Sequence, residues 1–383
     1  MDKERKNSST VSVRTGNSYT VWFPQTRRFT LMKGVAWDIF LLMEEGLADD
    51  EIAVKTDFLS RYSEEEVSAF LIALRTETDV LKDPKNSLYT QVRANTPCTI
   101  PIEGMPYTRI LEINHTTLKI SADDSSVSDS LFPMMEHLKP EHHDFYDHSI
   151  EIFCHENIWH IRTDGQITER FRREELSFLK GAVLKTMASL VYQVPDDRWM
   201  ATFHASAVTD GKSSILFLGA PGRGKSTVAA LLQAKGYALL TDDFVLLDSN
   251  HEKAWKLPLA ISVKEGSMNA LSEVHPGIGQ LNKVPGSRKQ DVRYLPPRAS
   301  TILSTAFPVK RIILISYDPD IPFHVEIPEP EEAIAELLPE VWVNPFRENI
   351  IQFLNWFNRT GVSRVRYSDI GRLATMVASI FDE

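Results

Sequence analysis

The sequence predicts a multidomain protein of the α/β class. Its 383 residues suffice for two or three domains, and 43% hydrophobic and 25% charged residues are ordinary for globular proteins. Strand-like and helix-like segments form three blocks, at residues 18–85, 95–195 and 196–383. Strands and helices alternate in the last block, which is typical of α/β domains.

The first block, residues 18–85, predicts a small winged-helix domain. Residues 19–23 and 29–32 indicate two short strands, and residues 36–43 and 47–62 indicate two helices. A third helix is expected after Ser63, its N-cap, with Glu66 completing a capping box. The polar residues 1–17 contain no apolar run, so they predict a disordered tail and not a secretory signal.

The second block, residues 95–195, predicts an ancillary α+β domain. Residues 108–115, 116–121, 149–155 and 157–163 are rich in β-branched and aromatic residues, with turn residues between them. Residues 174–193 then indicate a helix. Its expected apolar positions are Leu176, Leu179, Val183, Leu184 and Met187.

Charge and cysteine content limit the function classes. The formal net charge of −10 disfavours nonspecific binding to nucleic acid, which needs a basic surface. Two cysteines are too few for a disulfide framework, and they lack a metal-ligand spacing. No apolar run is long enough to span a bilayer. A cytoplasmic protein without membrane or nucleic-acid partners is therefore expected.

The third block contains a glycine-rich loop. Residues 219–226 match the pattern G-x-x-x-x-G-K-[ST], between an apolar strand-like segment and an apolar-faced helix. Such a loop turns backbone N–H groups toward phosphates, its lysine reaches the β- and γ-phosphates, and its serine ligates Mg²⁺. ATP and Mg²⁺ are the expected cofactors. The expected nucleotide-binding residues are Gly219, Gly222, Arg223, Gly224, Lys225, Ser226 and Thr227.

Two adjacent acids follow the loop helix directly. Residues 238–243 indicate a strand that ends in Asp242 and Asp243. Because neighbouring strand residues point to opposite faces, we expect one carboxylate to ligate Mg²⁺ and the other to accept the proton of an attacking hydroxyl. An acid pair so close behind the loop is typical of enzymes that bring a hydroxyl acceptor to the γ-phosphate.

Residues 204–248 resemble the HPr kinase/phosphorylase family, whose P-loop fold is shared with phosphoenolpyruvate carboxykinase. The resemblance rests on FHASAV, GAPGRGKST and LLTDD. It implies that Asp242 is the general base assisted by His204 and that Asp243 lies toward the metal. Lys225 would be the catalytic lysine in the transfer of the γ-phosphoryl group. Thr227 stands where that family usually has a glutamate, and the family's second signature is not recognisable in this sequence. The resemblance therefore does not extend to HPr as the substrate, to the reverse reaction or to a hexamer.

Further downstream, PLAISVKEGS and SRKQDVRYLPP resemble divergent HPr-kinase-related proteins found with peptide-modification genes. Residues 281–298 hold five Lys or Arg against one acid, which suits ATP phosphates or an anionic substrate. A solvated surface loop is the alternative. The expected substrate- or phosphate-binding residues are Lys264, Arg288, Lys289 and Arg293.

Residues 21–81 resemble PqqD-like leader-peptide-recognition domains. Such domains hold a precursor peptide as an added β-strand, packed on the third helix. The resemblance implies a peptide-binding set of Tyr19, Val21 and Phe23 on an edge strand, with Phe70 and Leu74 near the groove. A structural winged helix or a DNA reader is the alternative, and the acidic start of the third helix disfavours DNA.

Six of the eleven histidines lie between His137 and His160. No pair has the spacing of a helical H-x-x-x-H site, so the pattern favours a surface role over a metal site.

The leading interpretation is an ATP-dependent kinase that phosphorylates a Ser or Thr hydroxyl of a peptide. The peptide would be a ribosomally made precursor, as in lasso-peptide tailoring, held by the N-terminal domain, which raises the local acceptor concentration. A small-molecule hydroxyl kinase, or a nucleotide-binding regulatory protein without transfer activity, is the alternative. The nucleotide donor, the peptide and a homo-oligomeric state stay open.

Overall fold

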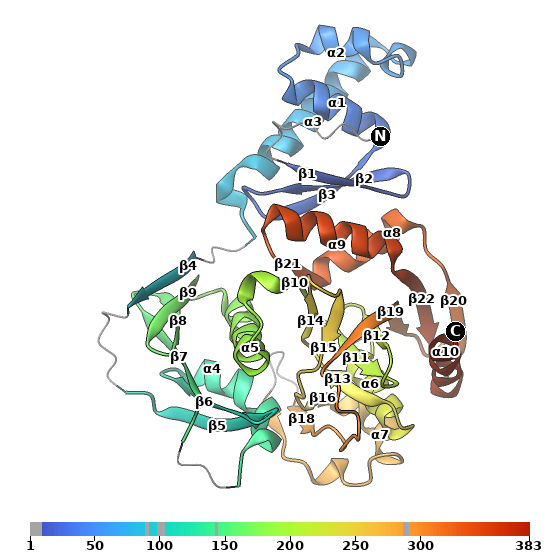
Figure 1. Ribbon diagram of the computed structural model, residues 1–383. Coiled ribbons are helices and arrows are strands. Elements are labelled where there is room, and N and C mark those ends of the chain that lie inside the picture. Colours follow the sequence, from blue (N-terminus) through green and yellow to red (C-terminus); the bar gives the residue numbers. More distant parts are fainter. Residues whose placement is uncertain (1–9, 89–91, 98–103, 142–144, 286–290) are drawn as a thin grey trace. The chain divides into compact units, whose positions relative to one another are not determined.

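The computed structural model describes residues 10–88, 92–97, 104–141, 145–285 and 291–383 (Figure 1). The protein is a mixed α/β protein with several sheets, and it divides into two compact units. The first unit combines the N-terminal residues up to 88 with residues 328–339 and 343–359, and the second holds the rest. Within the described residues, no helix has the length and apolar character needed to cross a membrane.

The sheet of the first unit is antiparallel, with the order β1-β2-β3. Its strands are β1 (Val11–Thr15), β2 (Ser18–Phe23) and β3 (Arg28–Lys33). The expectation of a disordered tail over residues 1–17 is wrong for residues 11–15. These residues pair with β2 across a two-residue turn, and Val11 and Thr15 are buried.

The position of β2 also corrects the expected edge strand. Because β1 pairs with one side of β2 and β3 with the other, Tyr19, Val21 and Phe23 lie on the central strand. Val21 and Phe23 are fully buried in a core cluster with Trp37 and Phe40. They therefore support the fold and cannot form backbone hydrogen bonds with an added strand. In the described part of the sheet, β3 has an unpaired edge.

Three helices follow the sheet: α1 (Gly34–Glu44), α2 (Asp49–Lys55) and α3 (Glu64–Lys82). The capping box at the start of α3 is confirmed, because Ser63 Oγ accepts from the Glu66 N–H and the Glu66 carboxylate accepts from the Ser63 N–H. Leu74 is buried in a core with Leu71, whereas Phe70 is 40% exposed.

Two helices from the far end of the chain complete this unit: α8 (Pro330–Leu337) and α9 (Arg347–Arg359). Both contact β1, and α9 lies along the small sheet (Figure 1). Asn358 Nδ2 donates to the Arg14 carbonyl at 2.8 Å, and Arg347 Nη1 donates to the Thr10 carbonyl at 3.4 Å. The unit is therefore discontinuous in sequence. The domain boundaries expected at 85 and 196 do not account for this.

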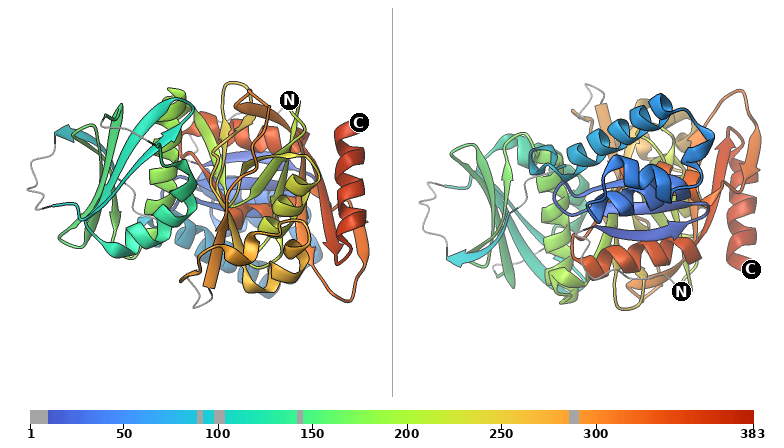
Figure 2. Two further views of the ribbon diagram at one scale, coloured as in Figure 1. Left: turned by 90° about the horizontal axis from the view of Figure 1, so that it is seen from below. Right: turned by 90° about the horizontal axis from the view of Figure 1, so that it is seen from above.

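The second unit begins with a six-stranded sheet of order β4-β9-β8-β7-β6-β5. Helix α5 (Leu176–Tyr192) lies along one face of this sheet (Figures 1 and 2), and all but Leu176 of its expected apolar positions are fully buried. Helix α4 (Ser125–Leu131) packs beside it. The strands are β4 (Val92–Pro97), β5 (Tyr107–Ile113), β6 (Thr116–Ala122), β7 (His148–His155), β8 (Ile158–Thr163) and β9 (Gln166–Arg172).

A ten-stranded mixed sheet carries the glycine loop. Its main path is β13-β11-β12-β19-β15-β14-β10-β21, and β22 pairs with β19 and β20. Strands β12, β19 and β22 are parallel neighbours, and β13 runs in the same direction because both β12 and β13 are antiparallel to β11. The strands are β10 (Trp199–Phe203), β11 (Ser206–Thr209), β12 (Ser214–Leu218), β13 (Ala238–Thr241), β14 (Val245–Asp248), β15 (Lys253–Trp255), β19 (Ala306–Tyr317), β20 (Phe323–Glu326), β21 (Val341–Val343) and β22 (Gly361–Tyr367).

A smaller sheet and three helices accompany the large sheet, and most of them share a hydrophobic cluster with its strands. They are the sheet of β16 (Ile261–Lys264), β17 (Val284–Pro285) and β18 (Asp291–Leu295), and the helices α6 (Lys225–Ala234), α7 (Met268–Ser272) and α10 (Ile370–Asp382). One hydrophobic cluster joins α5 to Trp199, Phe244 and Leu246. The residues expected as separate middle and C-terminal domains thus share a core in this unit.

Candidate functional site

The glycine loop connects the fully buried strand β12 to helix α6. Gly219, Gly222 and Gly224 have φ angles of +150°, +89° and +98°, which residues with a Cβ rarely adopt. A Cβ on Gly219 would lie 2.5 Å from the Ile315 carbonyl oxygen. The loop therefore passes its neighbours at a distance that only glycine allows, and the first N–H groups of α6 remain available for an anion.

Lys225 lies across this loop. Its side chain is 5% exposed, and Nζ donates to the Gly219 carbonyl at 2.5 Å. Burial lowers the pKa of Lys225, while the negative charges of Glu340, Asp243 and Asp242 act in the opposite direction. The ammonium group is thus within electrostatic range of both acids. A phosphate in the loop would compete with the Gly219 carbonyl for it.

Asp242 is buried beside the loop. One carboxylate oxygen accepts from Ser206 Oγ at 2.5 Å, and the other accepts from the Ser262 N–H at 3.0 Å. Burial, and then the charge of Asp243, raise the pKa of Asp242 to about 6, although hydrogen bonds from Ser206, Ser262 and Ser226 lower it. Desolvation therefore outweighs the hydrogen bonds that favour the charged form.

Asp243 has a different environment. It has a φ of +66° in the turn after β13, and its side chain is 36% exposed. One of its carboxylate oxygens lies 3.6 Å from His204 Nδ1, and the His204 N–H donates to the Glu340 carbonyl at 2.8 Å. The sequence analysis expects His204 beside Asp242, whereas the structure brings it against Asp243.

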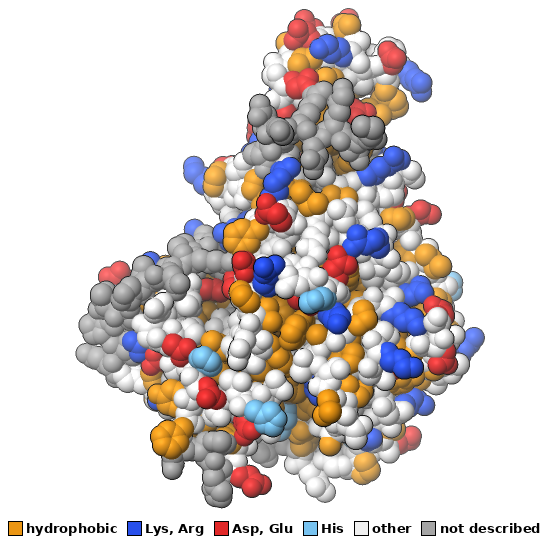
Figure 3. Space-filling view, in the orientation of Figure 1, with side chains coloured by type: hydrophobic (Ala, Val, Ile, Leu, Met, Phe, Trp, Pro, Cys, Tyr) orange, Lys and Arg blue, Asp and Glu red, His pale blue; other side chains and the backbone are white. Residues whose placement is uncertain are grey.

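The expected cationic residues are only partly assembled. Lys264 ends β16 and interacts electrostatically with Lys225. Arg293 is 7% exposed, and its Nη1 forms an ion pair with Glu265 at 2.8 Å, which neutralises its charge. Arg288 and Lys289 lie outside the described residues. On the face shown in Figure 3, Lys and Arg side chains are dispersed among acidic and hydrophobic ones.

Two further residues near the acid pair are missing from the sequence analysis. Lys180 lies on α5, where burial lowers its pKa and the charges of Asp243 and Asp242 raise it. Burial, and then the same two charges, raise the pKa of Tyr294 to about 12. Lys180 lies four residues after Leu176 and four residues before Leu184, within the apolar stripe of the helix. A charged residue within such a stripe is the sequence signal that could have identified it.

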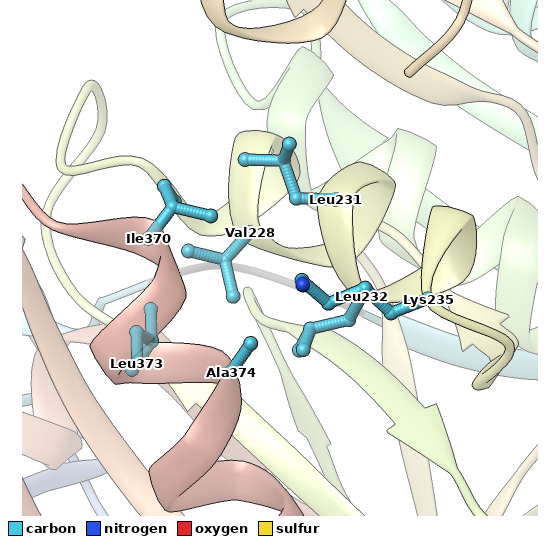
Figure 4. A pocket seen from close by; sticks show the side chains of 7 residues that line it. All are labelled: Val228, Leu231, Leu232, Lys235, Ile370, Leu373 and Ala374. Carbon is cyan, nitrogen blue, oxygen red and sulfur yellow. The ribbon is translucent and has the colours of Figure 1, made fainter.

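Other contacts hold the start of α6 in place. Thr227 Oγ1 lies 2.6 Å from Ser267 Oγ, which links the helix to the segment before α7. A small pocket between α6 and α10 is lined by apolar side chains of both helices and by Lys235 (Figure 4). Neither the glycine loop nor the acid pair lines it, so it is separate from this site.

The donor atoms at the site fit a hard divalent cation. Ser226, Asp242 and Asp243 offer hydroxyl and carboxylate oxygens, which Mg²⁺ prefers. Among the described residues, this site included, no group of three His, Cys, Asp or Glu side chains could by itself hold a metal. In the histidine-rich segment, His137 Nε2 lies 2.8 Å from the Pro258 carbonyl and His148 pairs with Asp164. His142 and His143 lie outside the described residues.

The solved structures that resemble this chain include a remote neighbour. No protein-family model matches the chain, and no curated protein matches it. The HPr(Ser) kinase/phosphatase from Coxiella burnetii is a weak structural neighbour, with 15% sequence identity and a TM-score of 0.22. The match covers 47% of this chain and 88% of that protein. A likeness of this size does not assign a function, which has to be argued from the site.

Proposed function

We propose that the protein is a Mg²⁺- and ATP-dependent phosphotransferase that moves the γ-phosphoryl group to a hydroxyl. The observation that carries the proposal is the placement of two consecutive carboxylates, one buried and one half-exposed, beside a lysine that spans a glycine loop. Phosphoryl transfer needs a cradle for the phosphates, positive charge, and a group that orients or deprotonates the acceptor. The loop, Lys225 and the acid pair supply these three parts.

We further propose that Asp243, with His204 beside it, receives the acceptor's proton, and that Asp242 and Ser226 belong to the metal side. This exchanges the roles that the resemblance implied for the two aspartates. Its support is that Asp243 is the more exposed carboxylate and has the histidine beside it, while Asp242 is enclosed near Ser226. Bound Mg²⁺ would supply positive charge that favours the ionised form of Asp242.

The proposed transfer forms one bond to phosphorus and breaks one. The acceptor oxygen forms a bond to the γ-phosphorus, and the bond from that phosphorus to the β,γ-bridging oxygen breaks. ADP leaves, and the hydroxyl proton passes to the Asp243 carboxylate. Lys225 would hold the β- and γ-phosphates during the exchange.

Matched isosteric variants test this assignment. We expect Asp243→Asn to lower single-turnover transfer by about 10²–10⁴-fold with Mg²⁺-dependent ATP binding retained, since proton transfer by a side chain contributes about that much. Asp242→Asn is expected to reduce transfer and the Mg²⁺ dependence of binding together. The reverse pattern would restore the roles implied by the resemblance. Wild-type protein that binds ATP but gives no phosphoproduct with any acceptor would contradict transfer.

For the acceptor, we propose a Ser or Thr hydroxyl of a ribosomally made peptide that docks on the first unit. The support is an unpaired strand edge at β3 and the exposed aromatic side chain of Phe70 on α3. Phe70→Ser should then raise the KM for the full peptide several-fold and leave the KM for a short acceptor fragment unchanged. An unchanged KM for the full peptide in the variant would instead favour the small-molecule kinase.

A further inference from the structure

Four strands bring chemically different residues to one edge of the large sheet. Because β13, β12, β19 and β22 run in the same direction, their carboxyl ends lie at the same edge. The acid pair follows β13, on one side of the strand that carries the glycine loop. Strands β19 and β22 lie on the other side of it. The loop therefore has an acidic side and a second side formed by the ends of β19 and β22.

Two tyrosines occupy that second side. Tyr317 is the last residue of β19 and Tyr367 is the last residue of β22, and they are register partners. Tyr367 is 1% exposed, whereas Tyr317 is 50% exposed. Their rings meet edge to face, with centroids 5.8 Å apart. The buried ring thus supports the exposed one from one side.

Tyr317 is also tied to the loop itself. Its backbone N–H donates to the Arg223 carbonyl at 3.1 Å, and Arg223 Nη1 donates to the hydroxyl of the neighbouring Ser316 at 3.0 Å. A Cβ on Gly224 would lie 3.7 Å from Tyr317 Cβ. The exposed ring therefore stands directly beside the part of the loop where α6 begins.

We propose that the Tyr317 ring stacks on the purine base of the nucleotide whose phosphates lie in the glycine loop. A triphosphate that presents its terminal phosphate to the acid pair has to extend its nucleoside toward the other side of the loop. An exposed aromatic ring on a rigid strand end offers a planar apolar surface of the kind on which bases stack. This inference rests on the proposed use of a nucleoside triphosphate, and it assigns the base a place that the loop motif leaves open.

The test compares ATP with inorganic tripolyphosphate, which has the phosphates and no base. We expect Tyr317→Ala to weaken ATP binding by about 5- to 100-fold, the range for removing one base–aromatic stack, and to leave tripolyphosphate binding unchanged. Tyr317→Phe should keep ATP affinity within about twofold, because the ring is retained. Lys225→Ala should weaken the binding of both ATP and tripolyphosphate. Titration calorimetry with the full chain measures each affinity.

Controls separate the possible failures. Tyr62→Ala removes a tyrosine of similar exposure, 48%, and should leave both affinities unchanged. Tyr317→Trp adds a reporter whose fluorescence should be quenched by ATP and not by tripolyphosphate, and this readout does not depend on the folding of Tyr317→Ala. ATP affinity that is equal in the wild type and in Tyr317→Ala, with no quenching, would overturn this inference alone. No ATP binding by the wild type would overturn the proposed function with it.

Discussion

At the scale of single residues, Asp242 shows a conflict between function and stability. Its pKa is about 6 in the folded protein against 3.8 for an unperturbed aspartate. The folded state therefore binds more protons than the unfolded state between about pH 4 and 6, so the free energy of unfolding falls as the pH rises through this window and stays low above it. We expect Asp242→Asn to be more stable than the wild type at pH 7.5, by on the order of 1–3 kcal/mol, with the difference vanishing near pH 4. Urea unfolding at the two pH values measures it.

Asp248→Asn is the matched control at a second buried aspartate. Its carboxylate accepts from the His251 N–H at 2.6 Å and from Trp255 Nε1 at 2.7 Å. These nitrogen donors cannot accept from an amide, whereas the Ser206 hydroxyl beside Asp242 can. Asp248→Asn should therefore destabilise by about 1–3 kcal/mol at both pH values. A loss of stability in Asp242→Asn that is equal at pH 4 and 7.5 would contradict the burial argument.

The residues that could be identified from the sequence stand in local patterns, whereas the contacts that were missed depend on tertiary structure. Lys225, Asp242 and Asp243 stand in a local pattern, and Ser63 and Glu66 are three positions apart, so sequence spacing alone brings them together. Lys180 and Asp243 are neighbours only because α5 packs in the same core as Phe244. The contact of His204 with Asp243 depends on the left-handed turn at Asp243, which the sequence pattern does not specify.

At the scale of elements, the glycine loop has two positions that look equivalent in sequence and differ in space. Gly222 and Gly224 both have positive φ, but a Cβ on Gly222 would meet no atom within 4 Å, while one on Gly224 would lie 2.4 Å from Tyr367 Oη. We expect Gly222→Ala to cost about 1–2 kcal/mol from backbone strain alone, and Gly224→Ala to cost more. Chemical denaturation of the two variants gives both values.

Tyr367→Phe provides the matching double-mutant cycle. The change removes the hydroxyl oxygen that a Cβ on Gly224 would strike and keeps the buried ring. Gly224→Ala combined with Tyr367→Phe should recover stability to about the level of Gly222→Ala, with a coupling of about 0.5–3 kcal/mol. Additive effects would show that the hydroxyl does not limit the space at Gly224.

Elements that depend on a local sequence pattern were predicted correctly, whereas the edge strand of the small sheet was not. Helices α3, α5 and α6 were predictable from apolar periodicity and capping residues. The edge position of β2 was not, because it depends on whether β1 pairs with it. Residues 11–15 alternate valine with polar residues, a weak signal in a segment that is otherwise polar.

At the scale of the whole molecule, the first unit is assembled from both ends of the chain. Its sheet includes β1, which contacts α8 and α9, so the N-terminal block does not end where its sequence pattern ends. Deleting residues 1–85 is a poor test of whether that block is only structural, because the deletion would take away the partners of α8 and α9. Point substitutions such as Phe70→Ser avoid this problem because they leave the unit assembled.

A short truncation tests this assembly. Deleting residues 1–17 should lower the thermal stability of the first unit and increase the binding of a dye specific for exposed apolar surface. It removes β1, exposes an edge of β2 beside the buried Val21, and takes away the carbonyls to which Asn358 and Arg347 donate. Deleting residues 1–9 is the matched control, since it keeps every one of these contacts. If the two truncations melted alike, with equal dye binding, β1 would contribute nothing to the unit. If only the longer one melted early, the start of the chain would be an integral part of the fold that holds α9.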